Sequence, residues 1–304
     1  VVKFNQGVSG HGMEIFSKTD PQLRAKLQAK LEGPKVGPFG KEDYFIVQPR
    51  IDGRKFFINT FTSSGTTVVT GLSEYFMMDW NGTTLYLVDP FLSLTSAEAK
   101  LLTPAALEVS RRMKVTIGSQ HLEFVIDLQT GKIYLLENNV RMAGAGVPAL
   151  EWEIYGMGQL ELSLFSHLDP SRLERELSLY PRVRKNAGLI AVIPSAYAGT
   201  LNPNSVREIE NLPSYFLPGP QYKIQPGSRV EATANQNTAA ALLHFRGSPI
   251  QIKKDLEAVL GLLLGGQLVT PPQFDANCSQ ALSRMGQSIS STLENFDWSK
   301  LGGE

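Results

Sequence analysis

Leu-Glu-Phe-Val-Ile-Asp-Leu-Gln-Thr-Gly-Lys-Ile-Tyr-Leu-Leu-Glu-Asn-Asn-Val-Arg, residues 122–141, decides how the rest of this chain is interpreted. Two short runs rich in β-branched and aromatic residues, 124–127 and 132–136, are separated by Gln129-Thr130-Gly131. A glycine between two such runs is typical of the turn in a β-hairpin. The stretch therefore predicts a hairpin, and its polar residues stand where apolar ones are expected.

The register of this hairpin brings two carboxylates together. If the loop is 129–131, residue 128 faces residue 132, and counting outward sets Glu123 opposite Glu137. Two carboxylates paired across strands repel each other unless a cation lies between them. Asn139 follows Glu137 by two residues, so in an extended chain its amide points to the same face. These three oxygen donors suit a hard divalent ion such as Mg²⁺.

An acidic residue, a hairpin and then Glu-x-Asn-x-Arg resembles the ATP-grasp superfamily, and in particular its pheganomycin-type peptide ligases. The matching residues here are Glu123, Glu137, Asn139 and Arg141, followed by the small residues 143–146. The resemblance implies that Glu123, Glu137 and Asn139 hold Mg²⁺ with ATP, and that Arg141 is catalytic. A solvated hairpin with a charged tip is the alternative interpretation of this stretch alone.

The start of the chain combines a lysine-bearing strand with a glycine-rich loop. Residues 1–5 are strand-like and contain Lys3, and residues 6–13 follow as Gln-Gly-Val-Ser-Gly-His-Gly-Met. Backbone N–H groups of such a loop and a nearby ammonium group can hold phosphate, although a plain loop after an edge strand gives the same pattern. The resemblance implies that Lys3 is catalytic and contacts the nucleotide phosphates, under a covering loop formed by Ser9, Gly10, His11 and Gly12.

A second nucleotide contact is implied after the strand at 44–48. In ATP-grasp proteins such a strand leads into the hinge between lid and core, where adenine binds, and Gln48, Pro49 and Ile51 fall at that place. This chain has Gln48 where an acid is common, and Lys55 where a ribose-binding glutamate is frequent. An ordinary turn around Ile51 is the alternative.

Local signals place several other elements. Asp20 and Pro21 predict the start of a helix that runs to Leu31. Asn81-Gly82 predicts a hairpin turn between the strands 76–80 and 84–88. Helical spacing covers 97–102, and Thr103 with Pro104 predicts the start of a separate helix that ends at Arg112.

After residue 146 the pattern changes. Helices are expected at 147–155, at 160–168 and from Asp169 onward, and then an apolar strand at 188–194. The later order of strands, turns and helices resembles the C-terminal domain of carboxylate-amine ligases in the superfamily. A small α/β domain for packing or dimerisation is the alternative, and the helix at 276–296 is amphipathic.

Composition limits the possible partners. The 304 residues include 29 Lys plus Arg and 29 Asp plus Glu, so neither a nucleic-acid nor a membrane partner is indicated. The single cysteine, Cys278, rules out an intrachain disulfide, and with no stretch typical of a secretory signal it favours the cytoplasm. The four histidines are scattered, which argues against a zinc site.

Together these patterns predict an α+β protein with the ATP-grasp fold, a mostly antiparallel core sheet and a C-terminal α/β domain. We expect a lid at 1–72, a core at 73–150 and a ligase-like domain at 151–304. The resemblance implies an ATP- and Mg²⁺-dependent ligase that joins small-molecule or peptide carboxylates and amines through an acyl phosphate.

Two other functions stay open from the sequence. One is a non-catalytic nucleotide-binding or assembly module, and the other is an ATP-dependent kinase or carboxylase on the same fold. ATP-grasp enzymes carry a further domain before the lysine strand, so we expect an N-terminal domain that is missing here or supplied by another chain. Homo-oligomer formation is the other possibility, with the amphipathic helix at 276–296 as a packing or dimer element.

Overall fold

The computed structural model describes residues 1–4, 16–17, 19–32, 36–37, 40–41 and 45–302. The chain forms two compact units, Val1–Asp52 and Gly53–Glu304. The domain borders expected at residues 72 and 150 fall inside β6 (Thr66–Trp80) and α3 (Val147–Tyr155). The three-part division of the chain stays a prediction.

The first unit contains one helix and two small antiparallel sheets. β1 (Val2–Phe4) pairs with β4 (Phe45–Val47), and β2 (Val36–Gly37) pairs with β3 (Gly40–Lys41). The predicted helix is present as α1 (Leu23–Glu32). Asp20 starts it, because one carboxylate oxygen accepts a hydrogen bond from the Gln22 N–H at 2.8 Å and the other pairs with Lys26 at 2.7 Å.

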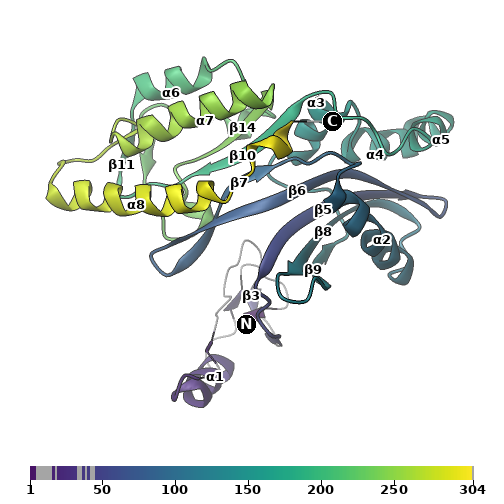
Figure 1. The fold of residues 1–304 in the computed structure, drawn as a ribbon, viewed down its shortest axis with the longest axis horizontal. Helices are drawn as coiled ribbons and strands as arrows, with labels where there is room; N and C mark the ends of the chain where they lie inside the picture. The colour runs from purple at the N-terminus through teal and green to yellow at the C-terminus, as the bar shows by residue number, and fades with distance from the viewer. Residues whose placement is uncertain (5–15, 18, 33–35, 38–39, 42–44, 303–304) are drawn as a thin grey trace. The chain divides into compact units, whose positions relative to one another are not determined.

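The second unit is built on an eight-stranded sheet in which every pair of neighbouring strands is antiparallel (Figure 1). The strand order is β12-β14-β10-β7-β6-β5-β8-β9. Besides β6, the strands are β5 (Gly53–Ser63), β7 (Thr83–Pro90), β8 (Ile117–Asp127), β9 (Ile133–Asn139), β10 (Ala187–Ile193), β12 (Tyr215–Phe216) and β14 (Ala241–Gly247). A smaller sheet joins β13 (Arg229–Val230), β11 (Gly199–Leu201) and β15 (Val269–Thr270).

The turn between β6 and β7 confirms the predicted hairpin. Trp80 pairs with Thr83, and the two residues between them, Asn81 and Gly82, have φ values of 47° and 78°. Positive φ at both central residues is the type I′ geometry that matches the twist of antiparallel strands. Asparagine and glycine tolerate this conformation better than other residues.

The β8–β9 hairpin reaches the predicted register by a different route. Glu123 is the partner of Glu137, as the counting required, but Ile126 pairs with Ile133 and Phe124 with Leu135. The loop therefore begins one residue earlier than expected, and the register shifts back between Glu123 and Phe124. The extra residue, Leu136, forms a β-bulge that restores the pairing of the two carboxylates.

One continuous helix replaces the two helices expected around Thr103. α2 runs over Ala97–Arg112 with Ser96 as its N-cap and Pro104 inside it, so the predicted start at Thr103 is wrong. Ala99, Leu102 and Ala106 are buried at helical spacing, whereas Pro104 is exposed. Burial of that apolar stripe offsets the backbone hydrogen bond that proline removes on the solvent side.

The C-terminal half completes the same large sheet. The helices expected at 147–155, at 160–168 and after Asp169 are present as α3, α4 (Gln159–Leu168) and α5 (Pro170–Leu177). β10 lies between β7 and β14, and all seven of its residues are buried. A strand covered on both faces explains the continuous apolar run seen in the sequence.

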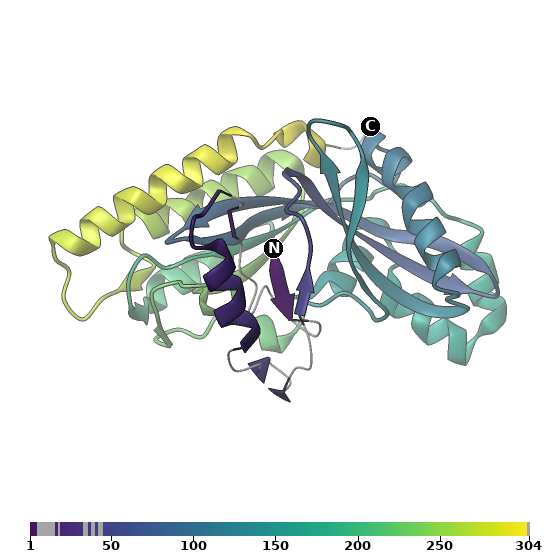
Figure 2. The same cartoon turned by 90° about the horizontal axis from the view of Figure 1, so that it is seen from below.

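Helices cover both faces of the sheet. α7 (Pro249–Leu264) packs on β10 and β14, and α8 (Ala276–Glu294) packs on β6. Figure 2 shows α8 and α2 on one side of the sheet and α4 and α5 on the other. α6 (Pro203–Glu210) and three short 3-10 helices, Pro220–Tyr222, Gln236–Thr238 and Trp298–Leu301, complete the unit.

Candidate functional site

The predicted metal ligands lie on one face of the sheet at its β8–β9 edge. Glu123 pairs with Phe57 on one side and Glu137 on the other, and His121 pairs with Asn139. Because side chains alternate along each strand, these residues share a face. The structure thus brings Glu123, Glu137 and Asn139 together, as the sequence predicted, although their role as ligands stays a prediction.

Glu123 is held as an ionised carboxylate. Its Oε1 accepts a hydrogen bond from Tyr75 Oη at 3.1 Å and lies 3.8 Å from His121 Nε2. Burial works to raise the pKa of Glu123, but the interactions with His121, Lys55 and Tyr75 together outweigh it and leave the pKa below its usual value. A half-buried anion is therefore present at the centre of this face.

Two tyrosines and a lysine surround that anion. The Tyr75 and Tyr86 rings lie 4.5 Å apart, and Lys55 Nζ lies 5.6 Å from the centre of the Tyr86 ring. Burial raises the pKa of both tyrosines well above the usual value, and the charge of Glu123 adds to this effect. Both phenols are consequently neutral hydrogen-bond groups at neutral pH.

Asp89 is a further carboxyl group that the sequence interpretation missed. It is 8% exposed on β7, and its Oδ1 is buried with no hydrogen-bond partner among the described residues. Burial, and then the charge of Glu123, raise the pKa of Asp89 well above its usual range. The signal for it in the sequence is an acid at the end of the apolar run Leu85-Tyr86-Leu87-Val88.

Glu137 and Asn139 supply the outer part of the oxygen set. Asn139 Nδ2 donates to Glu137 Oε1 at 2.8 Å, and Glu137 is exposed. In the described part of the chain no three His, Cys, Asp or Glu side chains form a group able to hold a metal ion. Two carboxylates and an amide fit Mg²⁺, because Mg²⁺ commonly takes one or two protein carboxylates and completes its shell with water and substrate phosphates. The donors present therefore fit a nucleotide-bound ion better than a closed protein cage.

Arg141 begins the loop that connects β9 to α3. It is exposed, and its Nη1 donates to the Met142 carbonyl at 2.8 Å. Two residues later the backbone is anchored, since the Ala143 N–H donates to Gln159 Oε1 at 2.9 Å. The guanidinium is thus carried by a loop whose far side is fixed to α4.

A buried network connects this loop with β8. Glu151, on α3, accepts hydrogen bonds from Asn59 Nδ2 at 2.7 Å and from the Gln159 N–H at 3.1 Å. Asn59 Oδ1 lies 2.7 Å from His121 Nδ1. Asn59, Glu151 and Gln159 are 0% exposed, so the network is shielded from solvent. Burial raises the pKa of Glu151 to about 7, against the opposing effect of its hydrogen bonds.

The predicted lid contacts belong to the first unit. Lys3 lies in β1, where it pairs with Ile46, but its side chain and the residues Ser9, Gly10, His11 and Gly12 lie outside the described part of the chain. Gln48, Pro49 and Ile51 lie between β4 and β5, directly before the border of the two units. The Gln48 backbone N–H and carbonyl are hydrogen-bonded to Val1 at 3.0 and 2.8 Å. Their roles in nucleotide binding stay predictions.

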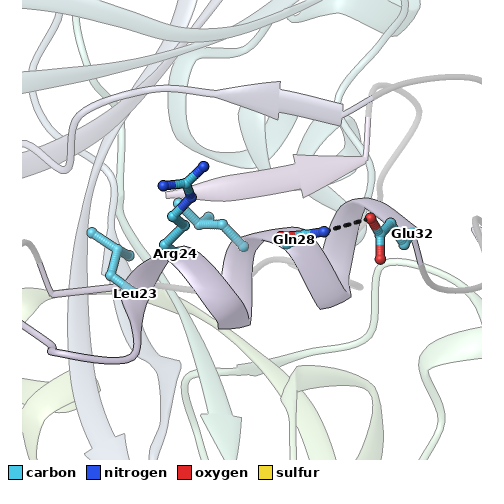
Figure 3. Close-up of a pocket in the computed structure, with 5 residues that line it drawn as sticks. Leu23, Arg24, Gln28 and Glu32 are labelled. Carbon is cyan, nitrogen blue, oxygen red and sulfur yellow. Dashed lines mark hydrogen bonds between the residues drawn. The ribbon is translucent and has the colours of Figure 1, made fainter.

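A hollow along α1 is separate from all of these residues. Leu23, Arg24, Leu27, Gln28 and Glu32 line it, and Gln28 Nε2 donates to Glu32 Oε1 at 2.8 Å (Figure 3). None of the predicted site residues lines this hollow.

Across the described residues, no helix is both long and apolar enough to cross a bilayer.

Similarity to known proteins is found in structure and not in sequence. No protein-family model matches the chain, and no curated protein matches it by sequence. An L-amino acid ligase from Bacillus licheniformis matches with a TM-score of 0.59 and 17% identity over 83% of this chain and 59% of the ligase.

Two biotin carboxylases also match. A biotin carboxylase from Campylobacter jejuni, solved in complex with β,γ-ATP, has a TM-score of 0.56 and 15% identity over 99% of this chain and 64% of its own. The biotin carboxylase domain of the Hydrogenobacter thermophilus 2-oxoglutarate carboxylase was solved with MgADP and bicarbonate. It has a TM-score of 0.57 and 13% identity over 99% of this chain and 63% of its own.

These matches define the architecture. The chain has the α+β ATP-grasp fold, as the hairpin motif predicted. It spans less than two thirds of the length of each of the three structures. At this level of identity the similarity concerns the fold, and the activity has to be argued from the site.

Proposed function

We propose that the chain is the ATP- and Mg²⁺-binding part of a ligase that joins a carboxylate to an amine. The observation that supports this proposal best is the pairing of Glu123 with Glu137, with Asn139 on the same face, in an ATP-grasp fold. The similarity to an L-amino acid ligase favours an amino acid or a short peptide as the carboxylate substrate.

The proposed reaction has two steps. A carboxylate oxygen attacks the γ-phosphorus of ATP, and the bond to the bridging oxygen breaks to leave an acyl phosphate and ADP. An amine then attacks the acyl carbon, inorganic phosphate leaves, an amide forms and the amine gives up a proton. Mg²⁺ held by Glu123, Glu137 and Asn139 would neutralise charge on the β- and γ-phosphates.

The residues of this chain would divide the remaining work. Arg141, exposed on its loop, stabilises the transferring phosphoryl group or the oxyanion that follows amine attack. Lys55 is a cation on the face that carries Glu123, where it contacts an anionic part of the nucleotide. Lys3, Ser9, Gly10, His11 and Gly12 would contact the phosphates, and exclusion of water would protect the acyl phosphate, which hydrolyses when exposed.

A second candidate is ATP-dependent carboxylation. Two biotin carboxylases align with 99% of this chain, a larger share than the ligase covers. In that reaction bicarbonate takes the place of the carboxylate substrate, and the acceptor nitrogen belongs to a cofactor and not to an amine substrate. The same metal and phosphate contacts serve either reaction, so the two candidates differ in the product.

Calorimetric titration of Mg²⁺-ATP into the chain tests the shared part of the proposal. We expect metal-dependent binding by the wild type, loss of at least tenfold in affinity for Glu137→Ala, and none for Glu257→Ala, an exposed acid on α7. Equal binding by all three proteins would rule out the hairpin as the nucleotide site. Phosphate release with pairs of amino acids, compared with release in bicarbonate and biotin, then separates ligation from carboxylation.

A further inference from the structure

Glu151 is a buried carboxylate for which the proposed reaction has no role. It lies on α3, is 0% exposed and uses its two oxygens for two different parts of the molecule. Oε1 accepts from Asn59 on β5, and Oε2 accepts from the Gln159 N–H at the start of α4. The backbone of β6 passes so close at Gly71 that a Cβ there would collide with Glu151. The carboxylate is therefore confined from several sides.

The hydrogen bonds of Gln159 fix which of its side-chain atoms donates and which accepts. Gln159 Nε2 donates to the carbonyls of Thr60 and Gln120 at 3.0 and 2.8 Å. Its Oε1 must then be the atom that accepts from the Ala143 N–H. Gln159 thereby ties the loop after Arg141 to the sheet, while its own N–H is held by Glu151.

The other arm fixes the tautomer of His121. The Asn59 amide N–H donates to Glu151 Oε1, so Asn59 Oδ1 faces His121 Nδ1 and must accept a hydrogen bond from it. Nδ1 is therefore the donor of this contact, and it orients the ring so that Nε2 lies 3.8 Å from Glu123 Oε1.

We propose that Glu151 is a positioning residue that couples the two halves of the candidate site. Through Asn59 it holds His121 in the Nδ1–H tautomer beside Glu123, and through Gln159 it holds the loop that follows Arg141. The effect on catalysis rests on the proposed function, whereas the two structural effects do not. The Glu151 carboxylate thus controls both the hydrogen bonding of His121 on β8 and the position of the loop that follows Arg141.

The test compares the wild-type chain with Glu151→Gln by two measurements that need no activity. Nitrogen-15 NMR of His121 reports the tautomer, and hydrogen exchange reports the Ala143 amide. In Glu151→Gln one of the two carboxylate oxygens is replaced by an NH₂ group, which then faces either the Asn59 amide N–H or the Gln159 N–H. We expect a shift of His121 away from the Nδ1–H form and roughly tenfold faster exchange at Ala143. Thr70→Val is the matched control, because it removes only the 3.5 Å contact of Thr70 with the same carboxylate.

Each outcome decides one question. An unchanged tautomer and unchanged Ala143 exchange in Glu151→Gln would overturn the positioning role, even if the wild type binds Mg²⁺-ATP. Both changes in a protein that binds no nucleotide would support the positioning role and reject the proposed function. If Glu151→Gln does not fold, Asn59→Ala takes its place. We then expect His121 to leave the Nδ1–H form, while the Ala143 amide stays protected from hydrogen exchange. A retained Nδ1–H tautomer in Asn59→Ala would then overturn the proposal.

Discussion

Glu123 and Glu137 lie directly opposite each other on neighbouring antiparallel strands, and among the described residues neither carboxylate forms an ion pair with a lysine or arginine. Like charges in this position destabilise a sheet by up to about 1 kcal/mol. Glu123 is ionised in spite of its partial burial. A cation bound between the two carboxylates would offset the repulsion that facing charges produce.

The first prediction follows from that repulsion. In a metal-free buffer, Glu137→Gln should unfold at the same temperature as the wild type or slightly above it, because one of two facing charges is removed. With Mg²⁺ and ATP added, the wild type should gain thermal stability and the variant should gain much less. Thermal unfolding monitored with and without EDTA measures both effects. A metal-dependent gain that is equal in the two proteins would contradict the prediction.

The sequence was sufficient for this pairing but not for the way the chain achieves it. The β-branched and aromatic runs and the glycine between them predicted the hairpin, and counting outward from the loop predicted the partners Glu123 and Glu137. The early loop and the bulge at Leu136 compensate each other, and neither leaves a local signal. The same limit applies at Pro104, where burial of α2 against the sheet overrides a local helix-start signal.

The second prediction concerns a closed ring of charges that connects Lys300, near the end of the described chain, with β5, β6 and α2. Arg54 Nε lies 2.6 Å from Glu74, and Lys300 Nζ lies 3.1 Å from the same carboxylate, while Glu98 contacts both cations. Glu74 is 4% exposed. Glu74→Gln should lower the free energy of unfolding by about 3 kcal/mol, because it leaves partly buried cations without their main partner. Urea unfolding measures the loss.

Glu108→Gln is the matched control for that ring. Glu108 also pairs with two cations, Arg111 and Arg112, but on the exposed side of α2. Exposed pairs contribute little to stability, so the variant should unfold at nearly the wild-type urea concentration. Losses of equal size in the two variants would show that burial of Glu74 has no particular effect.

The long-range contacts of the candidate site were beyond prediction from the sequence. Asn59 and Glu151 are 92 residues apart in the chain, and their contact depends on how α3 crosses the sheet. Each is an ordinary polar residue in its own segment. Tyr75, Asp89 and the buried network became recognisable only in the folded sheet, since side-chain proximity between distant strands has no sequence signature.

The third prediction concerns stability between pH 5 and pH 7. The folded-state pKa of Glu151 is about 7 against an ordinary 4.5, so the folded state holds the extra proton in this range and Glu151 makes stability fall as the pH rises. Burial lowers the pKa of His244 to about 4 against an ordinary 6.5. There the unfolded state holds the extra proton, and His244 makes stability rise with pH. The two contributions oppose each other.

Single variants should separate these contributions. From pH 5 to pH 7 the free energy of unfolding should rise in Glu151→Gln by about 2 kcal/mol relative to the wild-type change, because Glu151 no longer opposes the contribution of His244. It should fall by about the same amount in His244→Gln, in which the amide can still donate to the Ala145 carbonyl. Urea unfolding at several pH values provides the slopes. Parallel pH profiles for all three proteins would contradict the two pKa shifts.

The fourth prediction contrasts two glycines of the larger unit. A Cβ at Gly71 would collide with Glu151 Oε1 and come within 3.0 Å of its Cδ, whereas a Cβ at Gly261 meets no atom within 4 Å. Gly71→Ala should cost about 1–3 kcal/mol, because a buried carboxylate with fixed hydrogen bonds has to move. Gly261→Ala, inside α7, should stabilise the fold by up to about 1 kcal/mol through the higher helix propensity of alanine. Chemical unfolding measures both, and NMR of His121 in Gly71→Ala adds a second readout. If the displaced Glu151 leaves the His121 tautomer unchanged, then Gly71 affects packing alone and the carboxylate does not control the ring.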